Sequence, residues 1–509
     1  SIYIYYQFRN LKMNTPMKNI LYTTTRIVAI GLLFASCDKF LDEVPDTRTE
    51  IDTPEKVQEL LVSAYPDALY MDIAETMSDN AGDKISLTET SILNTELYQW
   101  KDSKETRWDA PTFYWKAAWG AIASANHALE AVEKLGGGSS LNYLKGEALV
   151  ARAYAHFMLG LLWCKPYNPA TASSDLGLPY VTAAEKVVFA KYTRLSVEEY
   201  YKAIEKDLEE GLPLIDNTSY SKPKFHFTKE AAHIFATRFY LVKGEGPKLI
   251  AHANEALGSN PAAKVRDINK INTLTTLQRQ AQYSSTSEPS NALITGASSK
   301  YQRNLSRNKY GMTATLSVYL SQRSLHPLNM PWAYDFQGGN ENVQNIPKYQ
   351  EYFKVDNVSA GTGYPYGMAT LLLYDEALLN RMEAYVMTGQ TAKFIEDLKV
   401  YLPFKTGETL DVSNITETAL NTKYNGKGTE LSPAYTLTTP QRQMLQCLLD
   451  LRRIEFVFEG LRWFDIKRFG LKVIHQKGNQ TLELNKGDLR RELQIPEDAL
   501  AAGITPNPR

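Results

Sequence analysis

The stretch LQCLLDLRRIEFVFEGLRWFDIKRFG, residues 445–470, carries the strongest structural pattern in this sequence of 509 residues. Its apolar residues recur at helical spacing, since Leu451, Ile454 and Phe458 are separated by three and four positions. Residues spaced in this way share one face of an α-helix, and an apolar face of this kind packs into a protein core. The pattern therefore predicts a single core helix over 445–470.

A row of four charged residues follows the edge of this apolar face, again at spacings of three and four. One hypothesis is a pair of catalytic carboxylates, because two Glu side chains four residues apart on a helix lie close to the separation found in retaining glycosidases. The other is a structural ion network, in which neighbouring Arg side chains lower the carboxylate pKa values, whereas a general acid needs a raised pKa. We predict the ion network and no catalytic residue. The four residues are Arg452, Glu455, Glu459 and Arg462.

Residues 451–470 resemble, almost without interruption, the C-terminal signature of the SusD/RagB family of outer-membrane nutrient-binding lipoproteins. The resemblance implies a mainly α fold, with a degenerate tetratricopeptide-like (SusD-like) core of helical pairs and long irregular loop insertions that form the ligand face. It also implies capture of a glycan or oligosaccharide, which is delivered uncleaved to a SusC-like TonB-dependent transporter. Some family members bind peptides, so a peptide ligand is one alternative. A surface glycoside hydrolase that uses Glu455 and Glu459 is an alternative of a different class.

The composition is that of a globular protein rich in tyrosine. Hydrophobic residues make up 43% of the chain, enough for a large buried core. The formal net charge is -1 and no basic patch occurs, which argues against nucleic acid as a partner. The 31 tyrosines suit a binding surface, because each offers a flat apolar face and a polar tip.

The N-terminal residues are predicted to be processing signals that take no part in the fold. Residues 1–16 are an expected upstream extension, since Met13 and Met17 are both candidate start sites. Residues 17–36 have the basic start and short apolar run of a lipoprotein signal peptide, and the run is too short to span a membrane. Cys37 follows small residues, as in a lipobox, and is the expected lipidation site. An uncleaved anchor or ordinary secretory cleavage is the alternative.

The mature chain, residues 37–509, is predicted to be a single SusD-like helical domain, tethered to the outer membrane and facing the extracellular side. Two places carry Tyr followed by Gly four residues later, at predicted turns between paired helices. They are Tyr240 with Gly244 and Tyr385 with Gly389. This spacing is typical of a degenerate tetratricopeptide repeat.

No metal site and no cofactor is predicted. The seven His residues are scattered, and none forms the i, i+4 pair of a zinc protease or a Cys/His cluster. Apart from the expected lipidation site, the chain has only Cys164 and Cys447, and both are expected to be buried. The sequence leaves open whether they pair.

Two aromatic-rich segments are predicted to form the ligand face. One is the loop-rich insertion at 283–367, where helical periodicity is weak, and a long segment of this kind is usually functional. The other is the early segment 78–108, and the family resemblance implies ligand contacts from both. Sugar rings stack on aromatic faces, while their hydroxyls bind amides and carboxylates. The candidates are Asp79, Asn80, Tyr98, Trp100, Trp108, Trp332 and Tyr334, whereas Trp115, Trp119 and Trp163 are assigned to the core.

Overall fold

The computed structural model describes residues 51–184 and 192–509, in which α-helices are the main element. The predicted extension (1–16), signal peptide (17–36) and lipidation site (Cys37) lie outside the described residues. Within those residues the structure contains 18 α-helices, α3 to α20, so the mainly α prediction is confirmed. None of these described helices is both long enough and apolar enough to cross a membrane.

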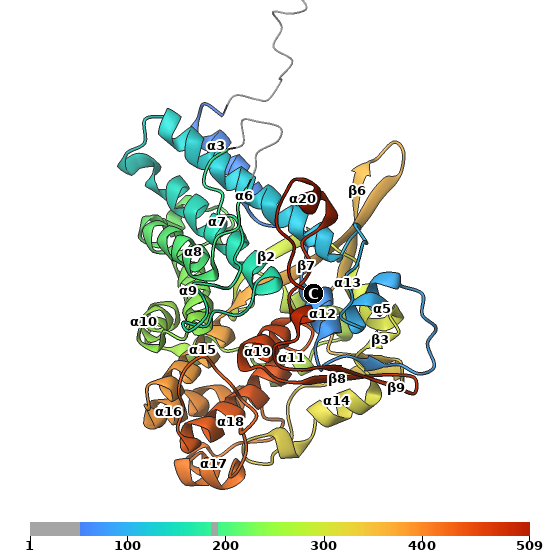
Figure 1. The fold of residues 1–509 in the computed structure, drawn as a ribbon. Coiled ribbons are helices and arrows are strands. Elements are labelled where there is room, and N and C mark those ends of the chain that lie inside the picture. Colours follow the sequence, from blue (N-terminus) through green and yellow to red (C-terminus); the bar gives the residue numbers. More distant parts are fainter. Residues whose placement is uncertain (1–50, 185–191) are drawn as a thin grey trace, which may run out of the picture. The chain divides into compact units, whose positions relative to one another are not determined.

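The two longest helices, α6 (Pro111–Lys134) and α7 (Asn142–Trp163), form a hairpin pair (Figure 1). Helix α7 is buried along almost its whole length, because α6 and α8 (Val197–Gly211) both pack against it. The contact with α8 is close, since a Cβ atom on Gly146 would lie 2.9 Å from the backbone oxygen of Gly211. Glycine at this position therefore lets the two helices approach.

A second group of helices repeats this paired arrangement, and its inner members pack against one another. The turn of each pair contains a glycine predicted from the sequence, and Gly244 and Gly389 have φ angles of 74° and 70°. Glycine adopts this left-handed conformation without steric cost and commonly ends a helix. The prediction of a helical-pair core is confirmed by these pairs. The helices are α9 (Lys229–Lys243), α10 (Gly246–Leu257), α15 (Tyr374–Met387) and α16 (Thr391–Tyr401).

The prediction of a single helix over 445–470 is wrong, because the chain forms two helices there, α18 (Thr439–Glu455) and α19 (Leu461–Phe469). Between them Phe458 and Gly460 have φ angles of 69° and 79°. These left-handed conformations do not occur inside a right-handed α-helix. Residues before and after the break therefore do not share one helix face.

The insertion at 283–367 is more regular than predicted. It contributes β2 (Asn291–Ser298), β6 (Glu351–Asn357) and the first half of β7 (Thr362–Leu373), which form an antiparallel sheet in the order β2-β7-β6. Strand β2 is buried over almost its whole length, so it lacks the apolar–polar alternation that identifies a half-exposed strand. The hairpin of β6 and β7 projects away from the helices (Figure 1).

The C-terminal segment after α19 contributes one wall of the candidate site. Strands β8 (Val473–Lys477) and β9 (Gln480–Leu484) form a hairpin, and the chain continues to α20 (Glu497–Ala501). On the way it is fixed to the end of α7, where the Trp163 indole Nε1 donates to the carbonyl of Gln494 at 3.0 Å.

Cys164 and Cys447, whose pairing the sequence leaves open, are both free and buried.

The remaining named helices and strands are short. The short elements are α3 (Pro54–Leu61), α4 (Met71–Met77), α5 (Ile92–Tyr98), α11 (Ile268–Asn272), α12 (Thr276–Tyr283), α13 (Tyr301–Arg307), α14 (Ala314–Leu320), α17 (Glu417–Lys423), β1 (Gly82–Asp83), β3 (Tyr310–Gly311), β4 (Gln337–Asn340) and β5 (Val343–Asn345).

Candidate functional site

Four aromatic rings from distant parts of the chain form one continuous stack. The Trp100 ring lies on that of His475, with centroids 4.4 Å apart. His475 lies on Tyr98 at 4.0 Å, and Tyr98 lies on Tyr310 at 4.1 Å. Successive ring planes are within 15° of parallel. The stack therefore holds Trp100 in a fixed orientation at one of its ends.

The imidazole of His475 is fixed by the main chain as well as by its ring neighbours. Its Nδ1 lies 2.7 Å from the carbonyl oxygen of Tyr98, and its Nε2 lies 2.8 Å from that of Ser78. Burial lowers the pKa of His475, and the two carbonyl oxygens oppose this shift. These contacts orient the ring on which Trp100 rests.

The backbone of Trp100 is strained. Its φ angle is 52°, in the left-handed region, which costs a bulky residue about 1–3 kcal/mol. The strain is maintained by the contact with His475 and by the indole Nε1, which donates to the carbonyl of Met77 at 2.9 Å. Residues held in such conformations cluster at binding and active sites. Strain thus distinguishes Trp100 from the other predicted ligand residues.

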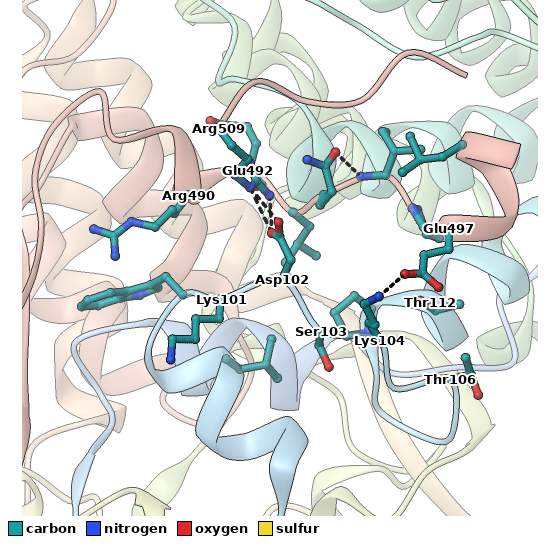
Figure 2. Close-up of a pocket in the computed structure, with 18 of the residues that line it drawn as sticks. Lys101, Asp102, Ser103, Lys104, Thr106, Thr112, Arg490, Glu492, Glu497 and Arg509 are labelled. Carbon is teal, nitrogen blue, oxygen red and sulfur yellow. Dashed lines mark hydrogen bonds and ion pairs between the residues drawn. The ribbon is translucent and has the colours of Figure 1, made fainter. Parts of the chain in front are cut away.

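A cavity of about 250 Å³, the Trp100 cavity, opens between the segment that follows α5 and the C-terminal segment. Figure 2 shows polar side chains of the two segments facing one another across it. Its apolar lining includes Leu97, Leu493 and Ile495 as well as the indole of Trp100. The polar lining residues are Lys101, Asp102, Ser103, Lys104, Thr106, Thr112, Arg490, Glu492, Gln494, Glu497, Asp498 and Arg509.

Two ion pairs connect the walls of the Trp100 cavity (Figure 2). Arg509 pairs with Asp102 at 2.6 Å, and Lys104 pairs with Glu497 at 2.8 Å. The pair of Lys104 with Glu497 is exposed and that of Arg509 with Asp102 is partly exposed, and pairs in contact with solvent contribute little to stability. They nevertheless balance the charge of the cavity, which suits an uncharged ligand.

Trp100 is only 3% exposed in the free protein, and the outer face of its indole is covered by Arg490, whose guanidinium carbon lies 5.7 Å from the ring centre. Arg490 also pairs with Asp488 at 2.7 Å, and this hydrogen-bonded pair raises the pKa of Arg490. The Arg490 side chain is 40% exposed, and cation–π contacts and ion pairs at such positions are each worth about 1 kcal/mol or less. A ligand can therefore displace Arg490 from the ring at small cost.

Three of the predicted ligand residues have structural contacts instead. Burial raises the pKa of the Asp79 carboxyl, but Arg453 and Arg462 outweigh this effect and hold the pKa well below its usual value. Asn80 is buried, and its side-chain oxygen accepts from Arg453 at 3.0 Å. Tyr98 has a ring on each face within the stack. A sugar has no open ring face or free amide to bind at these positions.

Trp108, Trp332 and Tyr334 do not line the Trp100 cavity. Trp332 and Tyr334 are buried, and the hydroxyl of Tyr334 donates to Glu455 at 2.5 Å. Trp108 is half-buried in the segment before α6. The structure therefore does not bring the early and mid-chain aromatic candidates together around one cavity.

The four charges of the signature are paired, but not with one another; Arg452, Glu455 and Arg462 are buried and Glu459 is half-buried. Each pairs with a residue outside the row of four, which corrects the prediction of pairing along one helix. The pairs are Arg452 with Asp465 (2.9 Å), Glu455 with Lys405 (2.7 Å), Glu459 with Lys348 (2.6 Å) and Arg462 with Asp79 (2.8 Å).

Glu455 and Glu459, the catalytic pair of the glycoside hydrolase alternative, do not line the Trp100 cavity. Glu455 is 2% exposed; burial raises its pKa, but Lys405 and Lys348 outweigh burial and hold the pKa at about 2. A carboxyl group with so low a pKa is ionised at neutral pH and has no proton to donate as a general acid. Glu459 is paired with Lys348, although burial raises its pKa. The geometry favours a structural role for both.

Sequence reasoning missed two features near the site. Trp119, assigned to the core, is half-buried and lines a second, more apolar groove of about 370 Å³ together with Trp115. The available signal was the pair of Trp residues four positions apart on α6. The C-terminal wall of the Trp100 cavity had no such signal, because its Arg, Glu and Gln residues are ordinary surface types.

The fold and the site define a paired-helix protein with a surface cavity bordered by a fixed aromatic ring. The sequence matches a family model, SusD-like_3, described as starch-binding associating with outer membrane, over residues 39–241. No curated protein matches the chain.

Solved structures share the fold along most of the chain. A SusD superfamily protein from Bacteroides thetaiotaomicron is 16% identical, with 90% of this chain and 100% of that chain covered and a TM-score of 0.64. One from Bacteroides fragilis is 19% identical, with 90% and 99% covered and a TM-score of 0.64. A SusD-like carbohydrate binding protein from Bacteroides vulgatus is 15% identical, with 88% and 96% covered and a TM-score of 0.61. Residues 39–241 thus match the SusD-like_3 model, and most of the chain shares the fold of these structures.

Proposed function

We propose that this protein binds a glycan in the Trp100 cavity and does not cleave it. The family model that it matches is described as starch-binding, and one structural neighbour is a carbohydrate binding protein. The observation that carries the assignment is Trp100, whose backbone is strained and whose indole is held by a stack of rings beside a charge-balanced polar cavity.

The chemistry of the cavity suits a sugar. A sugar ring has an apolar face, which stacks on an indole, and several hydroxyls, which need donors and acceptors. Ser103 and Thr112 offer hydroxyls, whereas the oxygen and the nitrogen of the Gln494 amide are both hydrogen-bonded to the main chain. A cavity of about 250 Å³ is near the lower end of ligand-binding pockets and would hold about one or two rings of a longer chain.

The cellular setting that we propose rests on the N-terminal sequence and on the family description. Cys37 would carry the lipid anchor, and the mature protein would lie on the outer membrane and pass its ligand to a SusC-like TonB-dependent transporter. Mass spectrometry of the processed N-terminus tests the anchor, since a mature chain without acyl groups on Cys37 would contradict it. Co-purification from solubilised membranes tests the transporter.

A binding screen with matched variants tests the function. The purified protein is titrated by calorimetry with soluble polysaccharides and with peptides, and each mixture is assayed for released sugar. We expect saturable binding of a glycan without release, weakened several-fold in Ser103→Ala and unchanged in Trp119→Ala. Loss of binding in Trp119→Ala alone would place the ligand in the apolar groove. Binding of peptides only, or release of sugar, would overturn the proposal.

A further inference from the structure

Two histidines meet across the helix pair α9 and α10, far along the chain from the segments that form the Trp100 cavity. His233 lies on α9 and His252 on α10, and their Nδ1 atoms are 2.9 Å apart. Both side chains are half-buried, so solvent and small ions reach them. The two nitrogens are close enough for one ion to bridge them, and imidazole nitrogen is a ligand that zinc, nickel and copper prefer.

The other ring nitrogen of His252, Nε2, contacts a carboxylate. Its Nε2 lies 3.2 Å from a carboxylate oxygen of Glu209, which also accepts from the hydroxyl of Tyr240 at 2.5 Å. The carboxylate favours the proton on Nε2 and leaves the lone pair on Nδ1. A carboxylate that orients the far nitrogen of a histidine is the usual support of a metal-binding imidazole. Tyr240 also stacks on the His252 ring, with centroids 5.4 Å apart.

Two carboxylates accompany the histidines. Glu230 lies three residues before His233, and Glu255 lies three residues after His252. On a helix this spacing places each carboxylate on the same side as its histidine. The negative charge near the two rings favours a bound cation.

We propose that His233 and His252 bind a divalent transition metal ion of the zinc class through their Nδ1 atoms. Water would complete the coordination, because no group of three or more His, Cys, Asp or Glu side chains in the described ranges is arranged around one ion. Zinc–nitrogen bonds of about 2.1 Å in a tetrahedron separate two nitrogens by about 3.4 Å. The two Nδ1 atoms, which share a hydrogen bond at 2.9 Å in the free protein, therefore have to separate by about 0.5 Å. The proton on Nδ1 of His233 has to move to its Nε2 when the ion binds. The ion would cross-link α9 and α10 away from their connecting turn, near the start of α9.

Calorimetric titration of the metal-free protein, prepared without a histidine tag, tests this site. We expect one equivalent of Zn²⁺ to bind, with no response to Mg²⁺, whose preferred ligands are oxygen atoms. His233→Ala should abolish the binding, and Glu209→Gln should weaken it about 10-fold or more. His127→Gln is the matched control and should bind as the parent does.

A second readout separates coordination from loss of fold. Co²⁺ bound in place of Zn²⁺ should give visible absorption bands that are absent in His252→Gln, while circular dichroism shows both variants folded. Unchanged Zn²⁺ binding in folded His233→Ala, or no saturable binding by the parent protein, would overturn the proposal and leave the two rings as a hydrogen-bonded pair. Neither result depends on whether the protein binds a glycan.

Discussion

Replacing Arg490 by Ala tests whether the glycan stacks on the outer face of Trp100. In the free protein this face is covered by the guanidinium of Arg490, which a stacking ligand has to displace. The displacement gives up a cation–π contact of about 0.5–1 kcal/mol and an exposed ion pair of about 1 kcal/mol or less. The variant has no such group to displace, so the ligand would keep this free energy. Because 1.4 kcal/mol is a factor of 10 in affinity, a gain of up to about 2 kcal/mol means that Arg490→Ala should tighten binding by up to about 30-fold.

Calorimetry with the glycan identified by the screen measures this effect, and Arg509→Ala is the matched control. Arg509 lines the same cavity and also pairs with a carboxylate, but the structure places it against Asp102 and not over the indole. Its loss should change affinity by less than about threefold, since an exposed pair contributes little. Weaker binding by Arg490→Ala than by the control would refute the stacking geometry. It would mean that Arg490 donates hydrogen bonds to the ligand from its present position.

Three further outcomes follow from the same contacts. Trp100→Phe keeps a ring on His475 but loses the hydrogen bond to the Met77 carbonyl. Urea unfolding should show a loss of about 1–3 kcal/mol in unfolding free energy, and glycan binding should weaken. Unchanged binding would place the ligand elsewhere. Glu455→Ala leaves Lys405 buried with one fewer carboxylate and should lower the unfolding free energy by about 3–5 kcal/mol in the same assay. An unchanged unfolding free energy would show that the pair of Glu455 and Lys405 does not stabilise the fold. Burial raises the pKa of Glu75 from 4.5 to about 7, so its contribution to stability is complete below pH 4.5 and is lost as the pH rises through 7. Glu75→Gln should remove up to about 3 kcal/mol of the fall in unfolding free energy between pH 4 and pH 8, and an unaltered pH profile would contradict the raised pKa.

The helical pairs were predictable because their signals are local. A glycine four residues after a tyrosine, at the end of an amphipathic segment, marks a turn whatever the rest of the chain does. Gly244 and Gly389 adopt the left-handed conformation that this signal requires. The break at Phe458 was not predictable from periodicity, since its apolar side chain fits the stripe. Gly460 was the one local indication of the helix break, because glycine is unfavourable inside a helix.

For the aromatic ligand candidates, by contrast, the sequence carries no local signal that separates binding residues from core residues. Tyr98, Trp100, Trp332 and Tyr334 have the residue types of a sugar site, but the same types fill cores, and only tertiary packing decides which of them borders a cavity. Trp100 borders a cavity because the C-terminal segment runs past it, almost 400 residues later in the sequence. The site residues of that segment could not be predicted, because their pairing with the early loop is set by long-range contacts.

The signature is buried away from the Trp100 cavity, yet a continuous series of contacts joins the two. Arg453 and Arg462, from the two sides of the helix break, bind Asp79 and Asn80. These residues follow Ser78, whose carbonyl oxygen contacts the His475 ring on which Trp100 rests. The break in the signature is needed for this arrangement, because one uninterrupted helix would fix the spacing of both arginines along a single axis. The buried charges of the signature therefore hold the early segment in the conformation that supports the indole, and the stretch that decides the fold also positions the proposed binding site.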